Sequence, residues 1–129
     1  MLDLAEHAAW VLAAAFTLSL AYELYRAAVK TGTSRHDSWR AFVRTNLTLY
    51  AAAALTIGAL FADFRWAPLA GLVFSVAVTA VSILYYNPII LPARQPARID
   101  WFETLVFTSL VFLAATLLAH QVLGRSLLT

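Results

Sequence analysis

The sequence predicts an all-α membrane protein in which four transmembrane helices form a bundle and both termini lie on the non-cytoplasmic side. The chain of 129 residues is 62% hydrophobic and 12% charged, whereas a soluble domain averages about 25% charged residues. Positions 66–93 carry no charge at all, and about 20 apolar residues suffice to cross a bilayer core. The mean hydropathy is +0.76. Lipid must therefore solvate most of this single domain, residues 1–129.

Composition also excludes several classes of protein. The chain has no cysteine, which excludes disulfides, thiolate metal sites and thiol catalysis. The net charge of +2 and the basic pI reflect charged loops and do not indicate a nucleic-acid partner. The acidic N-terminus is unlike a secretory signal, so we expect the first helix to stay in the protein. No phosphate loop, catalytic triad or HExxH motif is present, which favours a protein that is not an enzyme and binds no metal.

The first two spans are predicted at about 6–28 and 42–62. Asp3 and Glu6 resemble a capping box at the start of the first helix, and Gly32 is a typical residue at a helix end. Ser34 and Asp37 repeat the cap spacing before the second helix. The basic, amphipathic stretch 35–44 should lie at the membrane interface and lead into the second span.

The third and fourth spans are predicted at about 67–86 and 101–123. Asn87-Pro88 should end the third helix, because the residue before a proline avoids the α region. Pro88, Pro92 and Pro96 then predict an extended connector. Asp100 and Glu103 give a third cap pattern before the fourth helix.

The distribution of Lys and Arg predicts the orientation. The first and third loop regions hold most of these residues: Arg26, Lys30, Arg35, Arg40, Arg44, Arg94 and Arg98. The opposite side has only Arg65 and Arg125. By the positive-inside rule, loops 1 and 3 are cytoplasmic and both termini are outside.

Small residues recur at four-residue spacing on the first three helices and let backbones approach closely. The pairs are Ala15 and Ser19, Ala54 and Gly58, and Gly71 and Ser75. They predict close helix packing, either among the four helices of the chain or at an interface with another protein. For the second helix in particular, we expect Ala54 and Gly58 to face another helix.

Glu23 is an ionisable residue at membrane depth, which by default marks a candidate functional residue. We expect its carboxylate to pair with Arg26, one turn further along the helix, or with Arg44 at the inner end of the second helix. The alternative is coupling to a transported proton or cation.

Two further sets of residues are candidates for binding a cofactor. Arg44, Asn46, Tyr50 and Tyr85 could form a polar pocket for a lipid headgroup, a quinone or an anionic cofactor; the alternative is interfacial anchoring. His7 and His120 should both lie on the outer side, where facing histidines could bind a tetrapyrrole such as haem. The cofactor stays unknown, with lipid, quinone, carotenoid and tetrapyrrole as the options.

The start of the second helix resembles part of the membrane-associated glutathione and eicosanoid enzymes, which are four-span proteins of similar length with their termini outside. Arg40-Ala41, Asn46 and Tyr50 match their arginine–asparagine–tyrosine stretch. The glutamate that the family has just before the tyrosine is Leu49 here, and the third helix lacks the family's arginine before its tyrosines. The resemblance covers this stretch alone and implies a membrane enzyme of the glutathione-transferase type.

Three functions are therefore open. The leading hypothesis is a small non-catalytic subunit of a larger membrane complex, of the photosynthetic, respiratory or membrane-oxygenase type. Such a subunit would provide packing surface and hold pigment, quinone or lipid, with membrane lipids and other membrane subunits as partners. The alternatives are a small oligomeric transporter or channel that uses Glu23, and the enzyme implied by the resemblance. We expect a multi-pass protein of the bacterial inner membrane.

Overall fold

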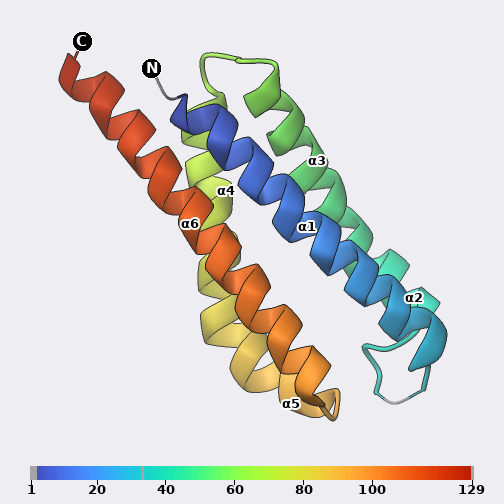
Figure 1. Ribbon diagram of the computed structural model, residues 1–129. Helices are drawn as coiled ribbons and strands as arrows, with labels where there is room; N and C mark the ends of the chain where they lie inside the picture. Colours follow the sequence, from blue (N-terminus) through green and yellow to red (C-terminus); the bar gives the residue numbers. More distant parts are fainter. Residues whose placement is uncertain (1–2, 33, 129) are drawn as a thin grey trace.

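The computed structural model describes residues 3–32 and 34–128, and long helices packed side by side make up most of this part of the chain (Figure 1). No strand occurs in these two ranges. The elements in order are α1 (Leu4–Val29), α2 (Trp39–Ala41), the π-helix η1 (Phe42–Asn46), α3 (Leu47–Phe61), α4 (Ala67–Val81), the π-helix η2 (Ser82–Ile90), α5 (Leu91–Ala93) and α6 (Arg98–Leu128).

Three helical segments are long and apolar enough to cross a membrane: Leu4–Val29, Ala67–Ala93 and Arg98–Gly124. Their outward faces carry large exposed apolar side chains, such as Leu84, which is 74% exposed, and Phe102, which is 64% exposed. Side chains of this kind suit a lipid environment. The segment that contains α3 is not among these three.

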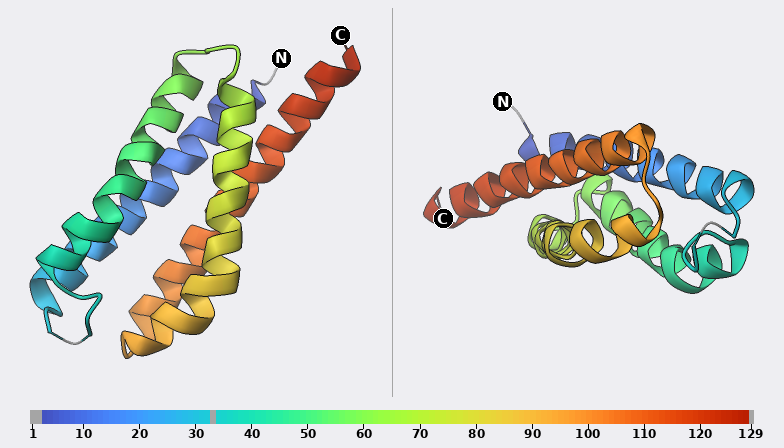
Figure 2. Two further views of the ribbon diagram at one scale, coloured as in Figure 1. Left: turned by 180° about the vertical axis from the view of Figure 1, so that it is seen from behind. Right: turned by 90° about the horizontal axis from the view of Figure 1, so that it is seen from below.

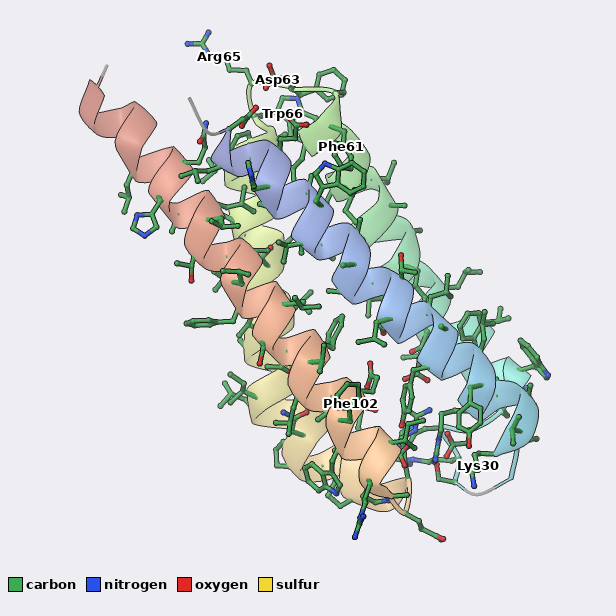
Figure 3. The ribbon with its side chains drawn as sticks, in the orientation of Figure 1. Lys30, Phe61, Asp63, Arg65, Trp66 and Phe102 are labelled. Atoms are coloured by element: carbon green, nitrogen blue, oxygen red, sulfur yellow. The ribbon has the colours of Figure 1, made fainter. Side chains whose placement is uncertain are left out.

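The two ends of the bundle differ in charge. Both chain termini and the turn between α3 and α4 lie at one end, and the 30–38 loop and the turn after α5 lie at the other (Figures 1 and 2). Figure 3 shows Lys30 at one end and Asp63, Arg65 and Trp66 at the opposite end. We call the end with Lys30, the 30–38 loop and the 94–97 turn the basic end, and the other the terminal end.

Capping side chains explain where two of the helices begin. Asp3 accepts hydrogen bonds from the backbone N–H groups of Ala5 and Glu6, which confirms the predicted start of α1. Before α2, however, the cap is Ser38, whose hydroxyl accepts from the N–H of Ala41. Asp37 was predicted in a cap pattern here, but its side chain is buried against two arginines instead.

The third helical segment continues past Pro88, which corrects the predicted helix end at Asn87 and the predicted extended connector. η2 contains Pro88, and α5 continues the helix to Ala93. In an α-helix the proline ring clashes with the carbonyl one turn earlier. The wider turn of a π-helix relieves that crowding, so the helix continues where the α-helical rule predicts an end.

α6 begins at Arg98, three residues before the predicted start, because Asp100 acts from inside its first turn. The Asp100 carboxylate accepts a hydrogen bond from the N–H of Ala97 at 2.7 Å. This is the backward half of a capping box, in which the third helical residue satisfies the N–H that precedes the helix.

The core is a seam of small and branched side chains between α1 and α6. Ala8, Leu12 and Ala15 of α1 have no exposed surface, and neither do Val111 and Leu118 of α6. Small side chains let the two backbones approach closely, and in lipid such packing is the main attraction between helices.

The small-residue prediction is correct in part. Ala15, Ser19, Gly71 and Ser75 are buried between helices. A Cβ on Gly71 would lie 3.1 Å from a methyl group of Leu118. Ala54 and Gly58 are exposed, and a Cβ on Gly58 would meet nothing within 4 Å. Within the described chain these two residues face no other helix, because Ala53 and Leu60 form the inward face of α3. The prediction that they face a helix of another protein stays a prediction.

Candidate functional site: a side-opening cavity beside a buried charge cluster

A cavity of about 360 Å³ lies in the half of the bundle nearer the basic end. Every long helical segment contributes to its wall, and most of the wall is apolar, with Leu49, Phe74, Val78 and Phe107 among the lining residues. The polar lining residues include Ser19, Glu23, Asn46, Tyr50, Tyr86 and Glu103. An apolar chamber with a few converging polar groups is the usual form of a small-molecule site.

The cavity opens on the side of the bundle. Ala77 and Val81 of α4 line it and are also exposed on the outer surface. Figure 2 shows that α3 and α4 lie close together at their shared turn and diverge toward the basic end. The cavity therefore reaches the outer surface of the bundle beside α4.

Glu23 is held by Arg94, which is a different partner from the two predicted. The Arg94 guanidinium donates one hydrogen bond to each carboxylate oxygen of Glu23, both at 2.8 Å. Such a two-point contact is the strongest arginine–carboxylate geometry. No ion pair joins Glu23 to Arg26 or Arg44 among the described residues, so the predicted partners are corrected.

Asp37 joins two arginines from different parts of the chain. Its side chain has no exposed surface. Arg26 of α1 donates from Nε and Nη2 to the two Asp37 oxygens, at 2.8 and 2.7 Å. Arg94 donates from Nε and Nη2 to the first of these oxygens, at 3.0 and 2.8 Å. Asp37 thus fastens the 30–38 loop to α1 and to the turn after α5.

Asp100 completes the cluster from the start of α6. Its carboxylate accepts a hydrogen bond from Arg26 Nη1 at 3.2 Å and another from the Tyr22 hydroxyl. Arg26 also donates to the backbone carbonyl of Arg94 at 2.7 Å. We call Glu23, Arg26, Asp37, Arg94 and Asp100 the charge cluster.

The two members of the charge cluster that lie in loops, Asp37 and Arg94, are stabilised in their ionised forms. Burial opposes the charge of Asp37, but hydrogen bonds from Arg26, Ser34 and Arg94 outweigh it and hold the Asp37 pKa below its usual range. Burial likewise opposes the charge of Arg94, and the hydrogen bonds and charge of Glu23 outweigh it and raise the Arg94 pKa. Burial, with the positive charges of Arg35 and Arg94, lowers the pKa of His36.

Glu103 is the exception among the acidic groups near the cavity. It lines the cavity and is only 6% exposed. Within residues 3–32 and 34–128 no hydrogen bond or ion pair reaches its carboxyl group, although Arg94, Glu23 and Asp100 act on it electrostatically. A buried carboxyl without a partner is costly, so it marks a place where something else can bind.

Only part of the predicted polar pocket exists. Asn46 and Tyr50 line the cavity, and Tyr50 shares a 2.8 Å hydrogen bond with Ser19. Arg44 and Tyr85 are exposed and are not part of the lining. The lining tyrosine is Tyr86, whose hydroxyl accepts a hydrogen bond from Arg94 at 2.9 Å. Tyr85 and Tyr86 are neighbours in η2, and neighbouring side chains on a helix point in different directions, so one lines the cavity while the other is exposed.

The predicted histidine site is not near the cavity. His7 and His120 are both exposed and lie in the halves of α1 and α6 that point to the terminal end. The His7 ring contacts the backbone carbonyl of Asp3 at 2.8 Å. The described residues contain no group of three or more His, Asp or Glu arranged to hold a metal ion.

Sequence reasoning missed Asp37, Tyr86, Arg94, Asp100 and Glu103 as site residues. Asp37, Asp100 and Glu103 matched helix caps, and Arg94 matched a solvated basic loop. The one available signal in the sequence was the presence of acidic residues beside the basic loops. Asp37, Asp100 and Glu103 all lie there, in or within a few residues of a predicted span.

Comparison with protein-family models, with curated proteins and with solved structures finds no match to this chain.

Proposed function

We propose that the chain is a four-span protein of the bacterial inner membrane that holds an amphiphilic small molecule in its cavity, as a non-catalytic subunit of a larger membrane complex. The observation that carries this proposal is the cavity itself. It is mainly apolar, it opens sideways, and its polar groups gather toward the basic end. A molecule with an apolar body and one polar head matches that distribution.

The fourth span in this proposal is formed by α2, η1 and α3, which join end to end from Trp39 to Phe61. At about 1.5 Å per residue this segment is roughly 35 Å long, which is enough to cross a bilayer core of about 30 Å. Its outward side chains are apolar along α3, including Leu55, which is 77% exposed.

The proposed orientation places the basic end in the cytoplasm and both termini outside. Loops rich in Lys and Arg stay on the cytoplasmic side of membranes. The basic end carries the two loop regions that hold most of these residues, and Figure 3 shows Arg65 at the terminal end. The cavity would then lie in the cytoplasmic half of the membrane.

Among the cofactors considered, lipid and quinone fit the cavity better than a tetrapyrrole. Both α-helical histidines, His7 and His120, lie toward the other end of the bundle, so neither can supply an axial ligand there. Hydroxyl and amide groups of Tyr50, Tyr86 and Asn46 can instead bond a small polar head.

A cavity-filling variant tests the proposal. Ala77→Phe should place a ring in the mouth of the cavity, whereas Ala80→Phe adds the same ring to an exposed site on the same helix outside the lining. Mass spectrometry of protein purified in a mild detergent should find an amphiphile on the wild type and on Ala80→Phe, and a loss of it on Ala77→Phe. Equal occupancy of the two variants, or an empty wild type, would refute the binding role.

The subunit role is tested on the same preparation. Proteins that co-purify in a fixed ratio with the wild type and survive a second, orthogonal purification step would support a hetero-complex. A chain that purifies alone, or only with copies of itself, would exclude the subunit role and leave the binding role intact.

A second candidate function is transport of a cation, and Glu103 is the observation that favours it. The sequence suggested Glu23 for this task, but Arg94 neutralises Glu23 with two short hydrogen bonds. Glu103 is the lining carboxyl that keeps no such partner among the described residues. Flux of a radiolabelled cation into proteoliposomes, lost in Glu103→Gln, would favour transport over static binding.

A further inference from the structure

We infer that the molecule held in the cavity is a lipophilic organic cation, whose positive head lies against the Glu103 carboxylate. This inference rests on the proposed binding role and names the chemical class of the ligand. It depends on a surplus of buried acidic groups, on the missing partner of Glu103 and on the aromatic wall around it.

The buried groups beside the cavity contain more acids than bases. Asp37, Asp100 and Glu103 are buried, and the Glu23 side chain is 12% exposed. The cations among them are Arg26 and Arg94, which are each 2% exposed. His36 lies nearby, but its lowered pKa favours the neutral ring at neutral pH. The buried acids therefore outnumber the buried cations.

The acidic group without a compensating cation is Glu103, because both buried arginines donate their hydrogen bonds to other groups. Arg94 donates hydrogen bonds to Glu23, Asp37 and Tyr86. Arg26 donates hydrogen bonds to Asp37, Asp100 and the backbone carbonyl of Arg94. A buried carboxylate that no side chain compensates must take up either a proton or an external cation.

The wall around Glu103 favours an organic cation over a metal ion. The lining includes the rings of Tyr50, Phe74, Tyr86 and Phe107. Aromatic faces attract alkylammonium groups and offer no ligand to a hydrated metal. The described residues also lack the cluster of three His, Asp or Glu that a metal site needs.

Binding of a cation should exchange with a proton. A carboxyl group that carries a proton must release it to water before it can pair with a bound cation. The charged and titratable groups that act on Glu103 are Glu23 of α1, Arg94 after α5, and Asp100 one turn earlier on α6. Glu103 also acts on Tyr50 of α3 and Tyr86 of η2. Affinity for the cation should therefore rise with pH.

The test uses radiolabelled benzyltrimethylammonium and the full chain in uncharged maltoside micelles. Wild-type protein should bind the probe saturably, with an affinity that increases with pH. Unlabelled decyltrimethylammonium should displace it and decanoate, an anion with the same chain length, should not. Glu103→Gln, which keeps the shape and removes the charge, should weaken binding at least tenfold.

Two controls separate loss of charge from loss of fold. Glu6→Gln removes an exposed acid from the other end of α1 and should leave binding unchanged. Glu103→Asp keeps the charge and should bind more tightly than Glu103→Gln. The inference is wrong if Glu103→Gln binds as the wild type does, if decanoate competes as well as the cation, or if sodium and potassium displace the probe equally well.

Failure of this inference can be told apart from failure of the proposed function. If an amphiphile co-purifies and Ala77→Phe removes it, but benzyltrimethylammonium does not bind, the cavity holds a neutral or anionic molecule and only the present inference falls. If no amphiphile is found and the probe does not bind, both fall.

Discussion

Asp37 shows how a single loop residue can organise the basic end. Its carboxylate accepts hydrogen bonds from Arg26, Arg94 and Ser34, all at 2.7–3.0 Å. These contacts join residues that are far apart in the sequence, so they form only when α1, the 30–38 loop and the turn after α5 come together. Two buried guanidinium groups depend on this one acid.

Asp37→Asn should therefore destabilise the protein strongly. We expect a loss of about 3 kcal/mol, at the lower end for a broken buried ion pair, because Arg26 keeps Asp100 and Arg94 keeps Glu23. Equilibrium unfolding in mixed detergent micelles measures it. Asp63→Asn is the matched control, since Asp63 lies in the exposed turn at the terminal end with φ 62°, which asparagine tolerates. Equal stability of the two variants would contradict the role of Asp37.

Asp37→Asn also isolates the contribution of Asp37 to the pH dependence of the unfolding free energy. The folded-state pKa of Asp37 lies below the ordinary value of 3.8, so its contribution is fully present above 3.8 and is lost as the pH falls through the folded-state pKa. The stability gap between wild type and Asp37→Asn should thus be constant from pH 7 to about pH 5 and narrow in stronger acid. A gap that widens on acidification would show that Asp37 is not ionised in the folded protein.

At the residue scale, the sequence predicts the kind of interaction but not the partners. Placing a carboxylate such as Glu23 at membrane depth requires a cation, and an arginine does pair with it. Which arginine depends on the path of the third helical segment. Arg94 becomes available only because the helix continues past Pro88, and no local pattern in the sequence indicates that π-helical continuation.

At the scale of elements, Gly71 and Gly58 form a natural pair of tests. Both are glycines in helices that pack together, α4 and α3. Gly71 faces Leu60 and Leu118 closely, whereas Gly58 faces open space. Close approach at Gly71 exists because no side chain is there.

Gly71→Leu should destabilise the bundle by about 1–3 kcal/mol through overpacking, and Gly58→Leu should leave its stability nearly unchanged. Thermal unfolding of the purified variants in detergent compares them directly. Two equally stable variants would show that α4 and α6 do not pack at Gly71, while a large loss in Gly58→Leu would indicate an interface with another chain on the outer face of α3.

The elements themselves were largely predictable. Hydropathy located the three helical segments that are long and apolar enough to cross a membrane, because a charge-free run of about 20 residues has few alternatives to a membrane helix. α1 and α4 begin within two residues of their predicted starts. The ends differ where tertiary contacts decide them: η2 carries the helix beyond Pro88, and Asp100 starts α6 early.

At the scale of the whole molecule, the structure separates a tightly packed half from a half that contains a chamber. Small side chains close the seam between α1 and α6 toward the terminal end. Toward the basic end α3 and α4 diverge, and the charge cluster joins α1, the 30–38 loop, the turn after α5 and the start of α6. The chamber could not be predicted from the sequence, because helical periodicity describes single helices and not the distances between them.

The central claim is that this bundle crosses the membrane four times, with its chamber and charge cluster in the cytoplasmic half. Three single-cysteine variants test it most directly, because the native chain has no cysteine and gives no background. Arg35→Cys reports on the first loop, Asp63→Cys on the second and Ala97→Cys on the third, and all three positions are exposed.

The measurement is labelling by a membrane-impermeant maleimide before and after the inner membrane is disrupted. We predict that Asp63→Cys reacts in intact cells, and that Arg35→Cys and Ala97→Cys react only after disruption. Labelling of Arg35→Cys and Asp63→Cys from the same side would contradict the account, because the segment from Trp39 to Phe61 would then not cross the membrane.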